Sequence, residues 1–237
     1  MAGEDNATPP GWLDRLTAAG GEWSWWPPLV RATAVGRGGD ETRAPAAVLA
    51  LLAGPPGRGP EPPPEAGLLL THRSPRMRSH AGQVALPGGK REESDESLTA
   101  CALREAREET GLNPAAVTTL GEAPARAVRP SGRPVTTVLG YAPRPERVWV
   151  NSPHEADEVF YAPLGALADP RRRLLVDVRG TATPAFRSRG FLVWGFTGMI
   201  VDALLRTAGW ERHWDPGRVR GLDEALASSR NGEPAAT

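Results

Sequence analysis

Apolar residues recur along the chain in short runs that predict β-strands. Residues 46–52 (AAVLALL) and 67–71 (GLLLT) are nearly continuous apolar runs, as expected for buried strands. Further strands are predicted over residues 117–122, 135–141, 148–150, 158–162 and 174–178. Residues 55–66 contain six prolines in twelve positions, which excludes regular structure. We therefore expect a stiff loop that joins the first two strands as a hairpin.

Two segments have apolar residues at helical spacing. A helix is predicted over residues 95–110, with Ser94 as its N-cap, Gly111 as its stop and a buried face made by Leu98, Ala102, Leu103 and Ala106. A second, core-facing helix is predicted over residues 194–205. Strands grouped around two such helices indicate an α+β or α/β sandwich with a mixed sheet.

The two ends of the chain have a different composition. Residues 1–40 are predicted to be an extension, partly disordered, in which Trp12, Leu13 and Leu16 form a short amphipathic helix. The tryptophans at 23, 25 and 26 are expected to pack against the domain rather than to form a binding surface. Residues 41–210 are predicted to be the main domain. Residues 211–237 are predicted to be a polar tail whose last ten residues are disordered.

Composition narrows the classes of function. Lys plus Arg and Asp plus Glu both number 28, so no overall basic field favours nucleic acid as a partner. No apolar run is long enough to span a membrane, and the acidic N-terminus does not resemble a signal peptide. We therefore expect a cytoplasmic protein. The single cysteine, Cys101, excludes an internal disulfide and a cysteine-based zinc site, and it is expected to be a packed side chain.

The predicted helix 95–110 carries three glutamates on one face. Glu105, Glu108 and Glu109 are three and four residues apart, and Arg104 lies four residues before Glu108. Carboxylates this close repel each other, and a hard cation such as Mg²⁺ would relieve that repulsion. Taken alone, the pattern is also typical of a solvated acidic face that pairs with Arg104 and Arg107.

The loop before the helix favours a site over a solvated face. Residues 86–90 read Leu-Pro-Gly-Gly-Lys and lead towards the helix. Glycine lets the backbone approach a metal or a phosphate without a Cβ between them. Gly88 and Gly89 are therefore candidate substrate-binding residues.

Together these residues resemble the Nudix box, Gly-x5-Glu-x7-Arg-Glu-U-x-Glu-Glu-x-Gly-U, where U is a bulky aliphatic residue. Residues 104–112 (REAREETGL) fit its second half, but six residues instead of five separate Gly89 from Glu96, so either Asp95 or Glu96 takes the box glutamate. The resemblance implies a Nudix fold, an α/β/α sandwich with a mixed β-sheet. It also implies Mg²⁺ or Mn²⁺ held by Glu105, Glu108 and Glu109. Glu105, Arg104 and Glu108 would be catalytic, with Glu105 a candidate base that Arg104 orients.

A longer stretch, residues 69–89, is similar to the signature of the coenzyme A pyrophosphatase branch, including the lengthened spacing. It implies a metal-dependent hydrolysis of coenzyme A or its derivatives to 3′,5′-ADP and 4′-phosphopantetheine. Arg73, Arg78 and His80 are candidate substrate-binding residues, although each could instead pair with acids of the helix. Glu155 and Glu158 are candidates for an additional metal ligand or base, although lone acids at a strand edge are more often solvated.

Two alternative functions stay open from the sequence. The chain could hydrolyse ADP-ribose or another nucleoside diphosphate derivative. It could also be a catalytically silent Nudix domain that acts as a ligand sensor or scaffold, although the intact Arg104, Glu105, Glu108 and Glu109 argue against this. The oligomeric state is undetermined, and a homodimer is one alternative.

Overall fold

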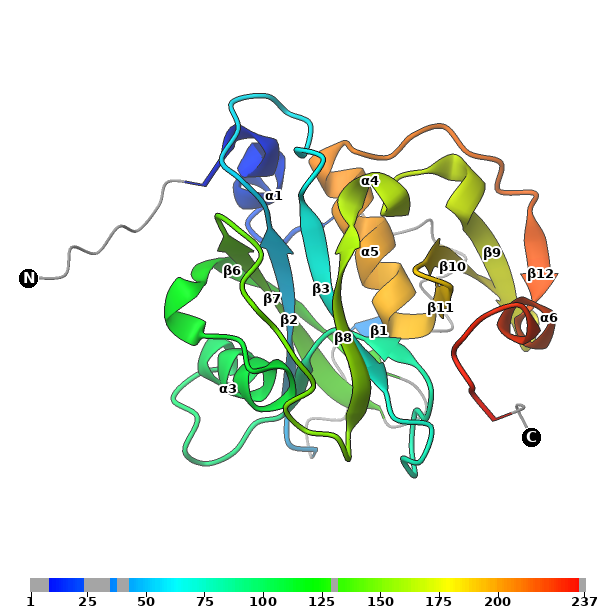
Figure 1. Cartoon of the computed structure of the whole chain (residues 1–237), viewed down its shortest axis with the longest axis horizontal. Coiled ribbons are helices and arrows are strands. Elements are labelled where there is room, and N and C mark those ends of the chain that lie inside the picture. The colour runs from blue at the N-terminus through cyan, green and yellow to red at the C-terminus, as the bar shows by residue number, and fades with distance from the viewer. Residues whose placement is uncertain (1–8, 24–34, 38–42, 129–131, 235–237) are drawn as a thin grey trace, which may run out of the picture.

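The computed structural model describes residues 9–23, 35–37, 43–128 and 132–234. A central mixed sheet organises the molecule (Figure 1). Its middle strand β2 (Ala46–Ala53) pairs parallel with β7 (Arg133–Ala142) and antiparallel with β3 (Gly67–Arg73) and β5 (Gly88–Lys90). The remaining strands of this sheet are β1 (Val35–Arg37) and β6 (Thr118–Val128) beyond β7, and β4 (Val84–Ala85) and β8 (Ala156–Pro163) beside β3.

Helices cover both faces of this sheet. Helix α3 (Leu98–Thr110) packs its small buried residues against alternate residues of β2, including Leu49 and Leu51. Helix α5 (Gly195–Ala208) packs on the other face, in a core that includes Ala50 and Leu52. The alternation along β2 therefore places successive side chains in two separate cores. The expected α/β/α sandwich with a mixed β-sheet is confirmed.

A second, four-stranded sheet lies beyond α5 (Figure 1). It has the order β11 (Phe191–Val193), β10 (Thr181–Ser188), β9 (Arg173–Val178) and β12 (Val219–Gly221). Only β9 was predicted as a strand. The short helices among the described residues are η1 (Gly11–Leu13), α1 (Asp14–Ala18), η2 (Pro114–Ala116), α4 (Leu164–Leu167), η3 (Pro170–Arg172) and α6 (Leu222–Ala227).

The predicted start of the site helix is wrong by one turn. Helix α3 begins at Leu98, and its N-cap is Ser97, whose Oγ accepts the Ala100 N–H at 3.0 Å. Asp95 precedes the helix and accepts the Glu92 N–H at 2.8 Å in a turn. Because the Asp95 carboxylate forms its hydrogen bonds in this turn, the helix begins after it. Ser97, and not Ser94, therefore caps the helix. The end of the helix at Gly111, in the left-handed conformation with φ 67°, is confirmed.

The strand predicted over residues 148–150 is absent from the described chain. Instead, the backbone N–H of Trp149 donates to Thr110 O and that of Asn151 donates to Glu109 O, both at 3.0 Å. This segment therefore satisfies carbonyls at the end of α3 rather than a sheet edge. Its apolar residues cover the helix terminus, with the Trp149 ring over Gly111.

Both ends of the described chain pack against the domain. The short helix near residue 14 is confirmed, with Trp12, Leu13 and Leu16 buried, and the packing role predicted for Trp23 is confirmed as well. Residues 25 and 26 lie outside the described residues. The prediction of disorder is wrong for residues 228–234, where Asn231 is fully buried. No helix in the described part of the chain is long and apolar enough to cross a membrane. The boundaries drawn near residues 40 and 210 stay predictions.

Candidate active site

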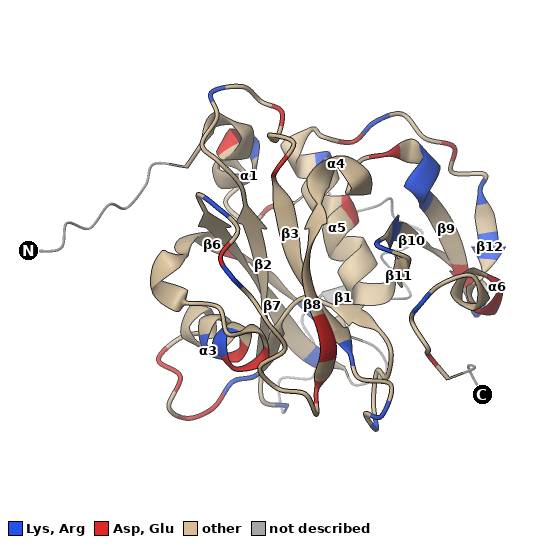
Figure 2. Cartoon of the chain, viewed as in Figure 1, with Lys and Arg blue, Asp and Glu red and all other residues tan. Residues whose placement is uncertain are grey.

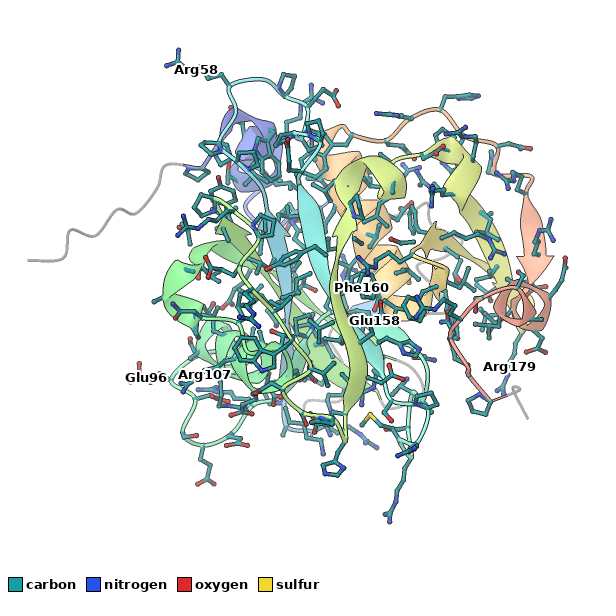
Figure 3. The ribbon with its side chains drawn as sticks, in the orientation of Figure 1. Arg58, Glu96, Arg107, Glu158, Phe160 and Arg179 are labelled. Atoms are coloured by element: carbon teal, nitrogen blue, oxygen red, sulfur yellow. The ribbon has the colours of Figure 1, made fainter. Side chains whose placement is uncertain are left out.

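Arg104 is held in place by Asp95. Its Nε and Nη2 each donate to one Asp95 carboxylate oxygen at 2.9 Å, and Nη2 also donates to Lys90 O at 3.1 Å. The side-chain hydrogen bonds from Arg104, with the Glu92 N–H, hold the pKa of Asp95 well below its usual range. Glu96 is exposed and projects outward (Figure 3). Of the two residues that the spacing left open, Asp95 is therefore the one that fixes Arg104.

Arg104 in turn faces two of the site glutamates. Its Nη1 lies 3.2 Å from Glu105 Oε1 and 3.0 Å from Glu108 Oε2. Acidic and basic residues thus lie side by side on α3 (Figure 2). This contact is the geometry expected if Arg104 orients Glu105.

The Gly88–Gly89 turn lies directly against the carboxylates of α3. The Gly88 N–H donates to Glu109 Oε2 at 3.3 Å. A Cβ placed on Gly89 would come within 2.3 Å of Glu105 Oε1, so any other residue there would displace the Glu105 carboxylate. Strand β5, which contains both glycines, pairs with β2 at Ala46–Val48. The sheet therefore fixes the turn against the helix.

Glu105 and Glu109 are poorly solvated acids. Burial is the main cause that raises the pKa of Glu109 to about 8, and the negative charges of Glu155 and Glu105 add to it, while Arg73 opposes it. Burial likewise raises the pKa of Glu105, against the effect of Arg104. A buried carboxylate and a partly buried one beside a glycine turn are oxygen donors of the type that Mg²⁺ and Mn²⁺ prefer.

The three predicted metal ligands do not form a ready-made cage. No group of three His, Cys, Asp or Glu side chains among the described residues is arranged to hold a metal ion. Glu108 has a side chain 56% exposed and paired with Arg104, while Glu109 is buried. The carboxylates therefore fit a divalent cation by chemistry and position, and Glu108 would have to turn away from Arg104 to join them.

The two candidates for an additional ligand lie in different places. Glu155, in the loop before β8, is near enough for its charge to raise the pKa of Glu105 and Glu109. Glu158 shares its face of β8 with Phe160, which belongs to the core on the α5 side (Figure 3). Its carboxylate binds Arg230 at 2.8 Å and lies 3.7 Å from Arg189. The structure thus brings Glu155, and not Glu158, to the acidic group.

A cavity of about 650 Å³ opens on the other side of the glycine turn. Four of the five predicted substrate-binding residues line it, namely Arg73, His80, Gly88 and Gly89. Arg78 is exposed and is not part of the lining. Among the described residues, the buried Nε of Arg73 has no hydrogen-bond partner, and this arginine also lies close enough to Glu109 to lower its pKa. Arg73 therefore links the cavity to the acidic group.

The cavity has further lining residues that were not predicted to bind substrate. Lys90 and Arg133 add positive charge, and Gln83, Trp194 and Phe196 add an amide and two rings. Trp194 and Phe196 stand out in the sequence as a Trp-Gly-Phe-Thr segment at a helix start, and Arg133 as a charged residue in an apolar strand. Each of these features is visible in the sequence, but no local pattern indicates that residues 83, 133 and 194 line one cavity.

Comparison with known proteins adds to this geometry. The model of the NUDIX domain family matches residues 44–180. Proteins described as uncharacterized Nudix hydrolase NudL, from Salmonella paratyphi B and Salmonella newport, are 40% identical over 150 residues, which cover 62% of this chain and 77% of theirs. The crystal structure of RenU, a Nudix hydrolase from M. smegmatis, has 31% identity and a TM-score of 0.43, covering 54% of this chain and 74% of RenU.

Proposed function

We propose, on the premise that this chain belongs to the Nudix hydrolase family, that it hydrolyses the diphosphate of coenzyme A or its derivatives. The family makes the chain a hydrolase of nucleoside diphosphate derivatives. That the substrate is coenzyme A, with 3′,5′-ADP and 4′-phosphopantetheine as products, is our proposal beyond the family assignment.

One observation carries the proposal. The cavity lies against the Gly88–Gly89 turn, whose opposite side contacts Glu105 and Glu109. A diphosphate at the turn would have the carboxylates on one side and room for a nucleotide on the other. The cationic residues Arg73, Lys90 and Arg133 around the cavity suit a substrate that carries a third phosphate, as coenzyme A does at its 3′ position.

The carboxylates of α3 supply the chemical step. Bound Mg²⁺ or Mn²⁺, held by Glu105, Glu108 and Glu109, would neutralise charge on the diphosphate and lower the pKa of the attacking water. Glu105 accepts the proton of that water as its oxygen attacks phosphorus and the bond to the bridging oxygen breaks. Arg104, anchored by Asp95, orients Glu105. Glu155 is the candidate for an additional ligand or base.

The cationic residues of the cavity hold the substrate. Arg73, whose Nε has no hydrogen-bond partner among the described residues, is suited to the diphosphate because its charge acts on Glu109 of the acidic group. His80 lines the cavity wall. Arg78 lies outside the lining, so we propose for it only a peripheral contact with the 3′-phosphate.

A product analysis tests the proposal. The purified full chain is incubated with coenzyme A, NADH or ADP-ribose in the presence of Mg²⁺ or Mn²⁺, and products are separated by anion-exchange chromatography. We expect 3′,5′-ADP from coenzyme A at the highest kcat/KM. Cleavage of ADP-ribose alone would reject coenzyme A as the substrate, and no cleavage of any of the three would support a silent domain.

A further inference from the structure

The end of the described chain packs against residues that line the cavity. We call residues 229–233 the C-terminal strap. The Asn231 side chain is fully buried, accepts the Leu192 N–H at 2.8 Å and donates to Leu192 O at 3.0 Å. The Asn231 side chain thus joins the strap to the backbone of β11.

The strap also contacts the β3–β4 hairpin. Asn231 O lies 2.9 Å from His72 Nε2, and the other ring nitrogen of His72 lies 2.5 Å from an Asp157 carboxylate oxygen. A Cβ on Gly82 would come within 2.4 Å of Asn231 O, so the strap and the hairpin approach each other closely. Arg230 adds an ion pair with Glu158 at 2.8 Å, and its guanidinium lies 4.6 Å from the centre of the Phe191 ring.

Glu233 connects this strap to two walls of the cavity. One carboxylate oxygen accepts Trp194 Nε1 and Asn231 Nδ2, both at 2.8 Å, and the other accepts Gln83 Nε2 at 3.4 Å. Trp194 and Gln83 both line the cavity, one from the start of α5 and the other from the loop before β4. Gln83 also bonds His80, a third lining residue, at 3.0 Å between Oε1 and Nδ1.

We propose that Glu233 is a positioning residue of the substrate cavity, which holds Trp194 and Gln83 in place and so couples substrate affinity to the seating of the C-terminal strap. The inference rests on the proposed function only in taking this cavity as the substrate's binding place. Removing the Glu233 carboxylate from water costs free energy, and its three hydrogen-bond donors offset that cost. A contact that only tied two exposed segments together would not need a carboxylate buried in this way. Two of its donors, Trp194 and Gln83, come from segments far apart in the chain, so the carboxylate bridges the two walls.

The experiment compares three variants by steady-state kinetics with coenzyme A. In Glu233→Ala the indole and the amide lose their acceptor, and we expect KM to rise about tenfold with kcat within about twofold of wild type. Glu233→Gln keeps an oxygen acceptor for Trp194 and should recover most of the affinity. Glu224→Ala is the matched control, because Glu224 lies on α6 and pairs only with the exposed Arg220 among the contacts described. Its KM should not change.

A second arm connects the effect to Trp194. Trp194→Phe removes the indole N–H, so adding Glu233→Ala to it should raise KM by less than about twofold further. Additive effects of the two substitutions would overturn the coupling. So would a Glu233→Ala variant that loses kcat instead of affinity, or one that matches Glu224→Ala.

Binding of ADP by isothermal titration calorimetry separates this inference from the proposed function. If wild type binds ADP but does not cleave coenzyme A, the choice of substrate fails, and weaker ADP binding in Glu233→Ala still supports the positioning role. Unchanged ADP binding in that variant rejects the role. If wild type neither cleaves coenzyme A nor binds ADP, the cavity is not a nucleotide site and the inference is rejected with it.

Discussion

At the scale of single residues, the three site glutamates have different surroundings although they share one helix face. Glu109 is buried, Glu105 is mostly buried beside Gly89, and Glu108 has a side chain 56% exposed. Burial raises the pKa of the first two, so they gain most from a cation. Glu108 is instead the carboxylate that can be altered with least effect on folding.

Glu108→Gln should therefore separate activity from stability. We expect kcat to fall at least about 100-fold, because a neutral amide is a poor ligand for a hard cation. The melting temperature without metal should stay within about 2 °C, since exposed ion pairs such as Arg104–Glu108 contribute little to stability. Kinetics and thermal unfolding of the same sample check this. Activity equal to wild type would contradict the role of Glu108 as a ligand.

The two arginines before the glycine turn should differ in which substrate they affect. Arg73→Ala should raise KM for coenzyme A and for its 3′-dephospho form alike, because Arg73 is proposed to hold the diphosphate. Arg78→Ala should raise KM for coenzyme A alone and by a smaller factor, because its contact is proposed at the 3′-phosphate. Equal effects of Arg78→Ala on both substrates would remove its proposed role.

At the scale of secondary-structure elements, the site depends on the contact between β5 and α3. Strand β5 is only three residues long, and β2 keeps it in register through Ala46–Val48. Its position lets Gly88 donate to Glu109 while Gly89 passes next to Glu105. A short strand held this way brings a backbone to two acids without any side chain between them.

Gly89→Ala should impair catalysis more than folding. The new Cβ would displace the Glu105 carboxylate, whose near oxygen lies 2.3 Å from that position, and this is the free end of a side chain rather than backbone. We expect kcat to fall at least about tenfold, with the free energy of unfolding changed by less than about 1 kcal/mol. Gly165→Ala in α4 is the control, because nothing lies within 4 Å of its added Cβ. A Gly89→Ala variant with normal kcat would show that Glu105 tolerates displacement.

At the scale of the whole molecule, segments from both ends of the chain complete the domain. Trp12 is 1% exposed, and its ring centroid lies 5.9 Å from that of Tyr141 and 5.7 Å from that of Trp210. Its indole N–H donates to Pro55 O at 3.3 Å. The N-terminal segment therefore closes the core on the α5 side, while the C-terminal strap binds Trp194 and Gln83, two residues that line the cavity.

Trp12→Ala should accordingly destabilise the whole domain. We expect the free energy of unfolding to fall by about 3–5 kcal/mol, because a large buried ring is replaced by a cavity. Urea unfolding followed by circular dichroism measures this loss. Val219→Ala, at an exposed hydrophobic position, is the control and should change stability by less than about 0.5 kcal/mol. A similarly small loss for Trp12→Ala would mean that the N-terminal segment is dispensable for the core.

Predictions from sequence succeeded where the signal was local. The buried strands around residues 46–52 and 67–71, and the apolar face of α3, follow from periodicity that any short window reveals. Predictions failed where the local sequence allowed two outcomes and tertiary contacts selected one of them. Ser94 and Ser97 are equally good caps by composition, and only the binding of Asp95 to Arg104 decides between them. Residues 148–150 have strand-like composition but bind the end of α3.

What the sequence by itself determined is the chemistry of the helix: carboxylates three and four residues apart, an arginine beside them, and a glycine turn before them. Helical spacing alone places those side chains on one face. Only the tertiary structure decided which further acidic residue lies near the carboxylates of α3. Glu155 and Glu158 are three residues apart, yet the pleat of β8 turns Glu158 to the opposite side of the sheet. The cavity beyond Gly88–Gly89 was likewise decided by tertiary contacts, because its lining includes residues 83, 133 and 194, which no local pattern relates, and Glu233 of the strap accepts a hydrogen bond from Trp194.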